Sequence, residues 1–136
     1  MTRRAATVFA FALASAACRR EPAAPPRDVF PELAGVWQRT ALHDIPASEA
    51  PDPVPRPGIR RVQAADYQGP GRLQARLYDL TDSAIGLDLA QRWRPSADTV
   101  FFWDRNYFVV IKWQDARRDA LQQFVREIEG RLKGPG

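Results

Sequence analysis

The sequence predicts an α+β domain built on a small antiparallel sheet, with helices packed on one face, behind an N-terminal export segment. Two observations predict the sheet: apolar and polar residues alternate over 72–78, and two apolar runs at 99–103 and 107–113 flank a short polar turn. Apolar residues at spacings of three and four near the C-terminus predict a helix. The expected order is strand, strand, helix, strand, strand, helix.

The chain opens with the pattern of a bacterial export signal. Arg3-Arg4 precede the apolar run Ala5–Ala14, and Ser15-Ala16-Ala17 lead to Cys18, the only cysteine. A charged start, an apolar core of roughly 7 to 15 residues and a small-residue cleavage site are what the export machinery recognises. A spanning helix needs about 20 apolar residues, more than this run has. We therefore expect residues 1–17 to be a cleaved signal peptide.

The segment Leu13-Ala14-Ser15-Ala16-Ala17-Cys18 resembles the lipobox of bacterial lipoproteins, in which the cysteine is diacylglycerylated and becomes the acylated N-terminus. It departs from that pattern at Ser15, where leucine is usual. The resemblance implies a lipid on Cys18 and a membrane anchor in the cell envelope; plain secretion after cleavage at Ala16 or Ala17 is the alternative. Because Arg19 replaces the aspartate that retains enteric lipoproteins on the inner membrane, the resemblance favours the periplasmic side of the outer membrane.

Prolines mark the boundaries of the folded part. Residues 18–29 hold three prolines and no apolar period, which predicts a flexible tether. A single domain is expected over 30–133. Inside it, five prolines lie between 46 and 58, where missing N–H donors and fixed φ exclude a helix or a central strand. That stretch predicts a long surface loop.

The first part of the domain is expected to be mostly strand. Residues 33–40 offer a short first strand or turn. Period-two alternation predicts strands over 59–67 and 72–78, and Gln68-Gly69-Pro70-Gly71 between them is typical of a turn. These two strands are expected to form a hairpin with one face in water.

A helix is expected after this hairpin. Asp82 or Ser83 can accept the free amides of a first turn, and Pro95 ends the segment. The apolar stripe of this helix recurs at spacing four and consists of Ile85, Leu89 and Trp93.

The second hairpin turns through Asp104-Arg105-Asn106, because Asn106 tolerates the left-handed conformation of short turns. Its strands are apolar on both faces, so we expect each face to be covered or the pair to be central in the sheet. The last helix is expected to start at a cap, Asp115, and to end at Gly134. Its apolar stripe is Leu121, Phe124, Val125, Ile128 and Leu132.

The polar side of the first hairpin is the candidate interaction face. Leu73, Ala75 and Leu77 are expected to face the core, which leaves their neighbours in water. Arginine and tyrosine are common in binding hot spots, so this side could dock on another envelope protein. The residues of this candidate face are Arg61, Arg72, Gln74, Arg76 and Tyr78.

A second hypothesis makes the protein a periplasmic carrier of a small apolar molecule, held between sheet and helices. The residues that suggest it are Trp93, Phe102, Phe108 and Trp113. Ordinary core packing accounts for the same aromatic residues, because aromatic side chains dominate the buried area of small domains. An enclosed apolar cavity would favour the carrier, and a closed core would not.

The sequence holds no recognisable catalytic or metal-binding arrangement. His43, the only histidine, lies beside Asp44 without a nucleophile motif. The acids Asp79, Asp82 and Asp88 do not follow the spacing of a calcium loop. A net charge of +4 is too small to indicate nucleic-acid binding. We therefore expect no enzyme activity, no cofactor and no metal, and the sequence leaves the partner and the oligomeric state open.

A further resemblance concerns the domain. Leu77-Tyr78-Asp79-Leu80, Ser83-Ala84-Ile85-Gly86-Leu87 and Tyr107-Phe108-Val109-Val110 together look like a family of uncharacterised bacterial exported proteins, over about residues 59–130. In that family a strand ending in an aromatic leads to a short Ala-aromatic-Gly helix and then a hairpin; here Ile85 replaces the aromatic. The resemblance implies export and an α+β fold, and nothing about chemistry.

Overall fold

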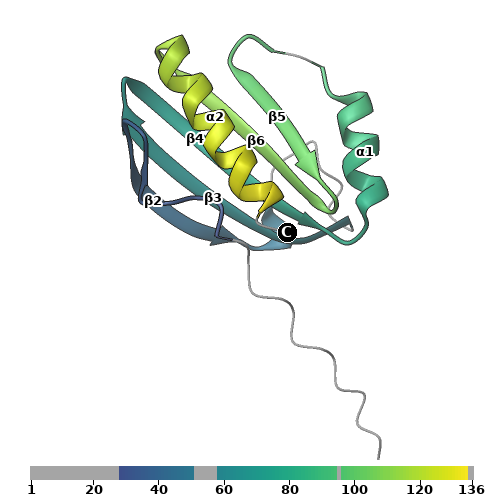
Figure 1. Cartoon of the computed structure of the whole chain (residues 1–136). Helices are drawn as coiled ribbons and strands as arrows, with labels where there is room; N and C mark the ends of the chain where they lie inside the picture. The colour runs from purple at the N-terminus through teal and green to yellow at the C-terminus, as the bar shows by residue number, and fades with distance from the viewer. Residues whose placement is uncertain (1–27, 51–57, 95, 135–136) are drawn as a thin grey trace, which may run out of the picture.

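The computed structural model describes residues 28–50, 58–94 and 96–134. Its strands pair antiparallel throughout, in one sheet of order β1-β2-β3-β4-β6-β5 (Figure 1). The α+β class is confirmed. The elements are β1 (Leu33–Ala34), β2 (Trp37–Ile45), the 3-10 helix η1 (Ala47–Glu49), β3 (Ile59–Gly69), β4 (Gly71–Leu80), α1 (Ser83–Arg92), β5 (Thr99–Asp104), β6 (Tyr107–Gln114) and α2 (Arg118–Lys133).

Two strands precede the expected order, so the predicted sequence of elements was incomplete. β2 pairs with β3 along nearly its whole length, although only a short strand or turn was expected there. The register shifts between Arg39 and Ala41, and Trp37 is the only fully buried residue of β2. The bulge interrupts the period of two, and an exposed strand carries few apolar residues. The apolar–polar alternation that would predict a long strand is therefore not visible in this part of the sequence.

The prediction that both helices lie on one face of the sheet was wrong. Neighbouring residues of β4 show this, because side chains alternate between the faces of a strand. Leu77 packs in the cluster that contains Phe124 of α2, whereas Tyr78 packs in the cluster that contains Leu89 of α1. The sheet is apolar on both faces around β4 and β6, so each face needs its own cover.

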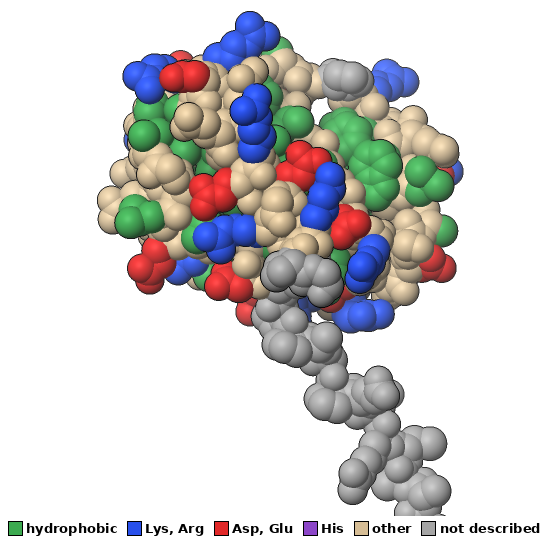
Figure 2. Space-filling model, viewed as in Figure 1, with side chains coloured by type: hydrophobic (Ala, Val, Ile, Leu, Met, Phe, Trp, Pro, Cys, Tyr) green, Lys and Arg blue, Asp and Glu red, His purple; other side chains and the backbone are tan. Residues whose placement is uncertain are grey.

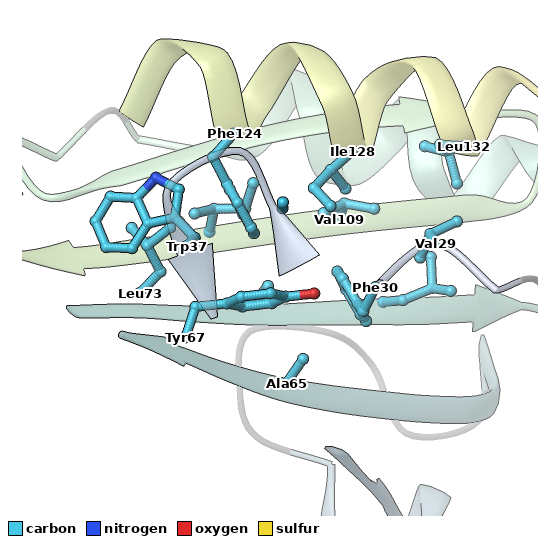
Figure 3. Packing of buried hydrophobic residues seen from close by; sticks show 14 of the residues in the cluster. Val29, Phe30, Trp37, Ala65, Tyr67, Leu73, Val109, Phe124, Ile128 and Leu132 are labelled. Carbon is cyan, nitrogen blue, oxygen red and sulfur yellow. The ribbon is translucent and has the colours of Figure 1, made fainter. Parts of the chain in front are cut away.

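The core between α2 and the sheet is built around aromatic rings (Figure 3). Phe124 is fully buried, and its ring centre lies 4.8 Å from that of Tyr67 and 6.3 Å from that of Trp37, both edge-on. The indole nitrogen of Trp37 donates a hydrogen bond to the backbone oxygen of Ala120 at 3.0 Å. This bond ties β2 to α2 and satisfies the one polar atom of a buried ring.

Val29, which was expected to be the last residue of the tether, already belongs to the folded part, one residue before the expected start of the domain. Val29 and Phe30 are fully buried in the cluster beneath α2 (Figure 3). The Arg39 guanidinium donates to the backbone oxygen of Phe30 at 2.6 Å, and the Tyr67 hydroxyl donates to that of Pro31 at 2.7 Å. The chain entering the domain is therefore held by both packing and hydrogen bonds.

Several predictions from the sequence fall outside the described residues. These include the signal peptide over 1–17, Cys18, and the tether up to residue 27. Most of the loop expected over 46–58 does as well, although its start forms η1 and Ala50 is buried against the sheet.

The helix caps were predicted with mixed success. Asp82 caps α1, and its carboxylate accepts a hydrogen bond from the backbone N–H of Ala84 at 2.9 Å, as expected. For α2 the predicted cap, Asp115, was wrong: the N-cap is Arg117, which has no side-chain capping bond. Asp115 instead has a φ of 54° in the connection that passes the β3–β4 turn. The backbone of Asp115 therefore belongs to the turn that precedes α2.

Alanine substitutions at two glycines should change the stability of the protein in opposite directions. Gly71 has a φ of +119°, and a Cβ there would lie 2.6 Å from the Asp115 backbone oxygen. We expect Gly71→Ala to lower the free energy of unfolding by about 2 kcal/mol or more. Gly130, inside α2, has open space around its Cβ position, so Gly130→Ala should raise it by about 1 kcal/mol. Urea denaturation of both variants checks this, and equal effects would contradict it.

Stability should fall at alkaline pH. Burial raises the pKa of Tyr67 far above its usual value, and burial also raises that of Tyr78. The unfolded tyrosines ionise near pH 10, before the folded ones, so the stabilisation is fully present below about pH 10 and is lost as pH rises above it. Urea denaturation between pH 8 and 11 measures this loss. Tyr67→Phe should flatten the alkaline decline, and an unchanged decline would argue against Tyr67 as its source.

Candidate functional site

The sheet face opposite α2 is covered only over part of its length. At one end, α1 and the chain after β2 cover a second apolar cluster. There the ring of Trp93 lies 5.2 Å from Phe101 and 5.6 Å from Phe108, and the latter two stack at 5.4 Å. The members of this cluster are Ala50, Ile59, Val62, Tyr78, Leu80, Leu89 and Phe108.

The other end of this face is open and hollowed. The hollow has a volume of about 470 Å³, and its floor is formed by β3, β4 and β6 with Thr40 of β2 at one side. We call it the polar groove, and its floor consists of Asp66, Gln68, Arg72, Gln74, Lys112 and Gln114. Tyr67, Leu73 and Trp113 also border the hollow, but their side chains point to the opposite face, where they pack under α2. The floor of the groove therefore carries no apolar side chain.

Strand register arranges the floor in two rows that cross the sheet. Asp66 pairs with Gln74, which pairs with Lys112. In the second row Gln68 pairs with Arg72, which pairs with Gln114. Neighbouring strands lie about 4.8 Å apart, so each row presents three polar groups over roughly 10 Å. The two cations therefore occupy diagonal positions on β4 and β6.

Charges in the groove are only partly neutralised by the protein. The Lys112 ammonium lies 3.9 Å from a carboxylate oxygen of Asp98, at the outer limit of an ion pair. Hydrogen bonds from the hydroxyls of Ser96 and Thr99 lower the pKa of Asp98, which keeps this neighbour ionised. Within the described part of the chain, Arg72 has no ion-pair partner. An anionic group could therefore approach Arg72 without displacing a salt bridge.

The α2 face has a different electrostatic character. Figure 2 shows basic and acidic side chains interspersed there. Along α2, Arg131 lies 3.5 Å from Glu127, and Lys133 lies 3.1 Å from Glu129. Such exposed i, i+4 pairs stabilise a helix slightly and satisfy each other's charge. The α2 face thus offers less unpaired charge for recognition than the polar groove.

The structure brings together part of the predicted interaction face. Arg72 and Gln74 are exposed in the polar groove, and Arg76 is half-buried on the same side of β4. Tyr78 was expected in water and is 2 % exposed, because α1 covers that end of the face. Burial raises the pKa of its phenol, and the nearby Arg76 opposes this rise.

Arg61 does not join the other members of the predicted face. In the strand register Arg61 lies opposite Asp79 of β4, and the register shifts between Ile59 and Arg61. Side chains alternate between the two faces of β3, so Arg61 lies on the same face as Tyr67, which packs under α2. The hairpin was expected to have one wet face, but β3 carries buried residues on both faces, so its two faces could not be assigned from the pattern alone.

The aromatic residues proposed for an apolar carrier site are divided between the two faces. Trp93 and Phe108 pack with α1, whereas Phe102 and Trp113 pack on the α2 side. They do not line one shared pocket. A separate apolar hollow of about 330 Å³ lies between α2 and the end of the β5–β6 pair. Of the four predicted carrier residues, only Trp113 lines this hollow; Val100, Leu121 and Val125 line it too but were not singled out, because they follow the same pattern as core residues.

The residues considered for catalysis have separate positions or structural roles. His43 and Asp44 are consecutive on β2, so their side chains point to opposite faces. Asp79 accepts a hydrogen bond from the Asn106 amide at 2.8 Å, and Asp88 pairs with Arg92 at 3.1 Å. Among the residues that the structure describes, no group of three or more His, Cys, Asp and Glu side chains could hold a metal ion.

No protein-family model, curated protein or solved structure matches the chain. The resemblance to exported proteins over residues 59–130 and the lipobox at Cys18 remain predictions from the sequence. Over the described ranges, neither helix has the length and apolar character needed to cross a membrane.

Proposed function

We propose that this chain is a lipid-anchored, non-enzymatic binding module of the bacterial envelope, and that the polar groove is its binding surface. The observation that carries the proposal is the uncovered half of the sheet face opposite α2. That half is hollowed and lined by three glutamines and two cations, and Arg72 has no ion partner among the described residues. A concave surface with a few convergent polar groups is the usual form of a binding site.

The predicted anchor would restrict where this surface can act. About ten residues separate Cys18 from Val29, and an extended chain spans at most about 3.6 Å per residue, roughly 35 Å in all. Two or more acyl chains make membrane attachment effectively permanent, since each buried methylene contributes about 0.8 kcal/mol. The groove would then meet partners at, or close to, the membrane surface, where tethering raises their effective concentration.

The composition of the groove favours binding over catalysis. Asp66 is the only carboxylate on its floor, and the floor holds no histidine, cysteine or serine. Nucleophilic catalysis needs a nucleophile beside a base, and general acid–base catalysis needs positioned groups that titrate near the working pH. The groove can donate and accept hydrogen bonds and hold charge, which is sufficient for recognition.

Photo-crosslinking of the full chain in a bacterial envelope tests this function. A photoreactive residue at Gln74, in the groove, should give discrete adducts that Arg72→Glu removes. The matched control is the same residue at Gln91, which is exposed on α1 outside the groove. Identical adduct patterns at both positions, or no adduct at Gln74, would contradict a partner at the groove.

A periplasmic carrier of a small apolar ligand is the second candidate function, with the apolar hollow between α2 and the β5–β6 pair as its site; this hollow opens to solvent and is not an enclosed cavity. Val100, Leu121 and Val125 give this hollow an apolar lining. An environment-sensitive apolar dye should bind there, and Val125→Trp, which fills the space, should abolish binding. Dye binding that Val125→Trp leaves intact would argue against a carrier site in this hollow.

A further inference from the structure

We infer that the ligand of the polar groove is a short peptide segment with a free C-terminal carboxylate, held at that end by Arg72 and Lys112 and at its amino end by Asp66. This inference rests on the proposed function, because it takes the groove as the binding surface. It adds the chemical class of the ligand and the direction in which the ligand lies.

The carboxylate end follows from the two cations. Arg72 pairs with Gln114 across β4 and β6, while Lys112 pairs with Gln74, so the cations are diagonal neighbours. Diagonal positions in an antiparallel pair lie about 7–8 Å apart, within reach of long side chains that share one anion. A guanidinium binds a carboxylate through two parallel hydrogen bonds, and an ammonium adds a point charge.

The amino end follows from the position of Asp66. It lies in the same row as Lys112 but two strands away, which is about 10 Å. An extended peptide spans about 3.3–3.6 Å per residue, so three residues cover that distance. Gln74 lies between the two ends, and its amide can donate to and accept from a peptide bond.

Charge and size favour a zwitterionic peptide over other occupants. A phosphate would gain the same two cations but would leave Asp66 without a cationic partner, whereas the ammonium of a zwitterionic peptide supplies one. An apolar ligand would bury the polar floor without replacing its hydrogen bonds, which is unfavourable. The volume of about 470 Å³ falls in the range of small-ligand sites.

Calorimetric titration with four forms of trialanine tests the ligand class. The full chain, purified from membranes in detergent, is titrated with trialanine, its C-terminal amide, its N-acetyl form and the doubly blocked form. Because a charged hydrogen bond is lost, amidation should weaken binding about tenfold or more. Acetylation should weaken it less, by about threefold to fivefold, because a single carboxylate contacts that end. Inorganic phosphate should compete weakly.

Two variants assign the ends of the ligand. Arg72→Gln should bring the ratio of the affinities for trialanine and for its C-terminal amide close to one. Arg118→Gln, which changes an exposed arginine on α2, should leave that preference unchanged. Asp66→Asn should remove only the preference for the free amino group. A circular-dichroism melt of each variant separates loss of binding from loss of fold.

The outcomes distinguish the ligand class from the function on which it rests. Equal affinities for acid and amide, stronger binding of phosphate than of trialanine, or no binding of any form would overturn the peptide inference. Groove adducts at Gln74 without trialanine binding would leave the binding module intact and reject only this ligand. A groove that neither crosslinks nor binds trialanine would reject both.

Discussion

Replacing Phe124 with alanine is expected to lower the free energy of unfolding by about 4 kcal/mol. The ring is fully buried beneath α2 and contacts both Tyr67 and Trp37 edge-on. Its removal forfeits the transfer free energy of the ring and leaves a cavity, which together cost about 3–5 kcal/mol for a buried Phe. A domain of this size is stabilised by only about 5–15 kcal/mol, so a large share of its stability would be lost.

Urea denaturation followed by tryptophan fluorescence measures this effect. Gln123→Ala is the matched control, since it changes the preceding, exposed residue of the same helix and should alter stability by less than about 0.5 kcal/mol. A loss below about 1 kcal/mol for Phe124→Ala would show that α2 does not seat this ring in a closed core.

Replacing Cys18 with alanine is expected to abolish lipid attachment, so that no acylated form of the protein is recovered. Without the sulfur no diacylglycerol can be added, so the chain should be released after a different cleavage or remain uncut. Intact mass of the protein recovered from the membrane fraction measures this. The natural chain should start at Cys18 and exceed the mass of the unmodified polypeptide by its acyl groups.

A second substitution provides the control for the anchor. Ser15→Leu restores the residue that lipoboxes usually carry and should keep or increase the acylated fraction. A natural chain that is soluble, begins at Ala17 or Cys18 and carries no lipid would contradict the anchor. The experiments on the polar groove would then apply to a freely diffusing protein.

Local pattern was sufficient for most elements of the domain. The alternation over 72–78 and the apolar runs around Arg105-Asn106 predicted β4, β5 and β6 to within two residues. Asp82 predicted the start of α1, because capping depends only on the first turn. The stripe that includes Phe124 and Ile128 correctly predicted which side of α2 is buried.

Part of the candidate site was also predictable. Arg72 and Gln74 were assigned to the exposed side of β4 by alternation alone, and both line the polar groove. Asp66 and Lys112, which complete its charged row, were not singled out, because each lies on a different strand and is an ordinary exposed charge in sequence. Only their register across three strands brings them together.

The sequence by itself thus determined the α+β class, the hairpins and the polar side of β4, since these depend on periods of two and 3.6 within single segments. Tertiary structure alone decided that α1 and α2 cover opposite faces, that Tyr78 is buried and that Arg61 lies apart from Arg72. The reason is physical: a local period shows that a strand has two different sides, but which side a helix covers, and over what length, depends on contacts between segments distant in the chain.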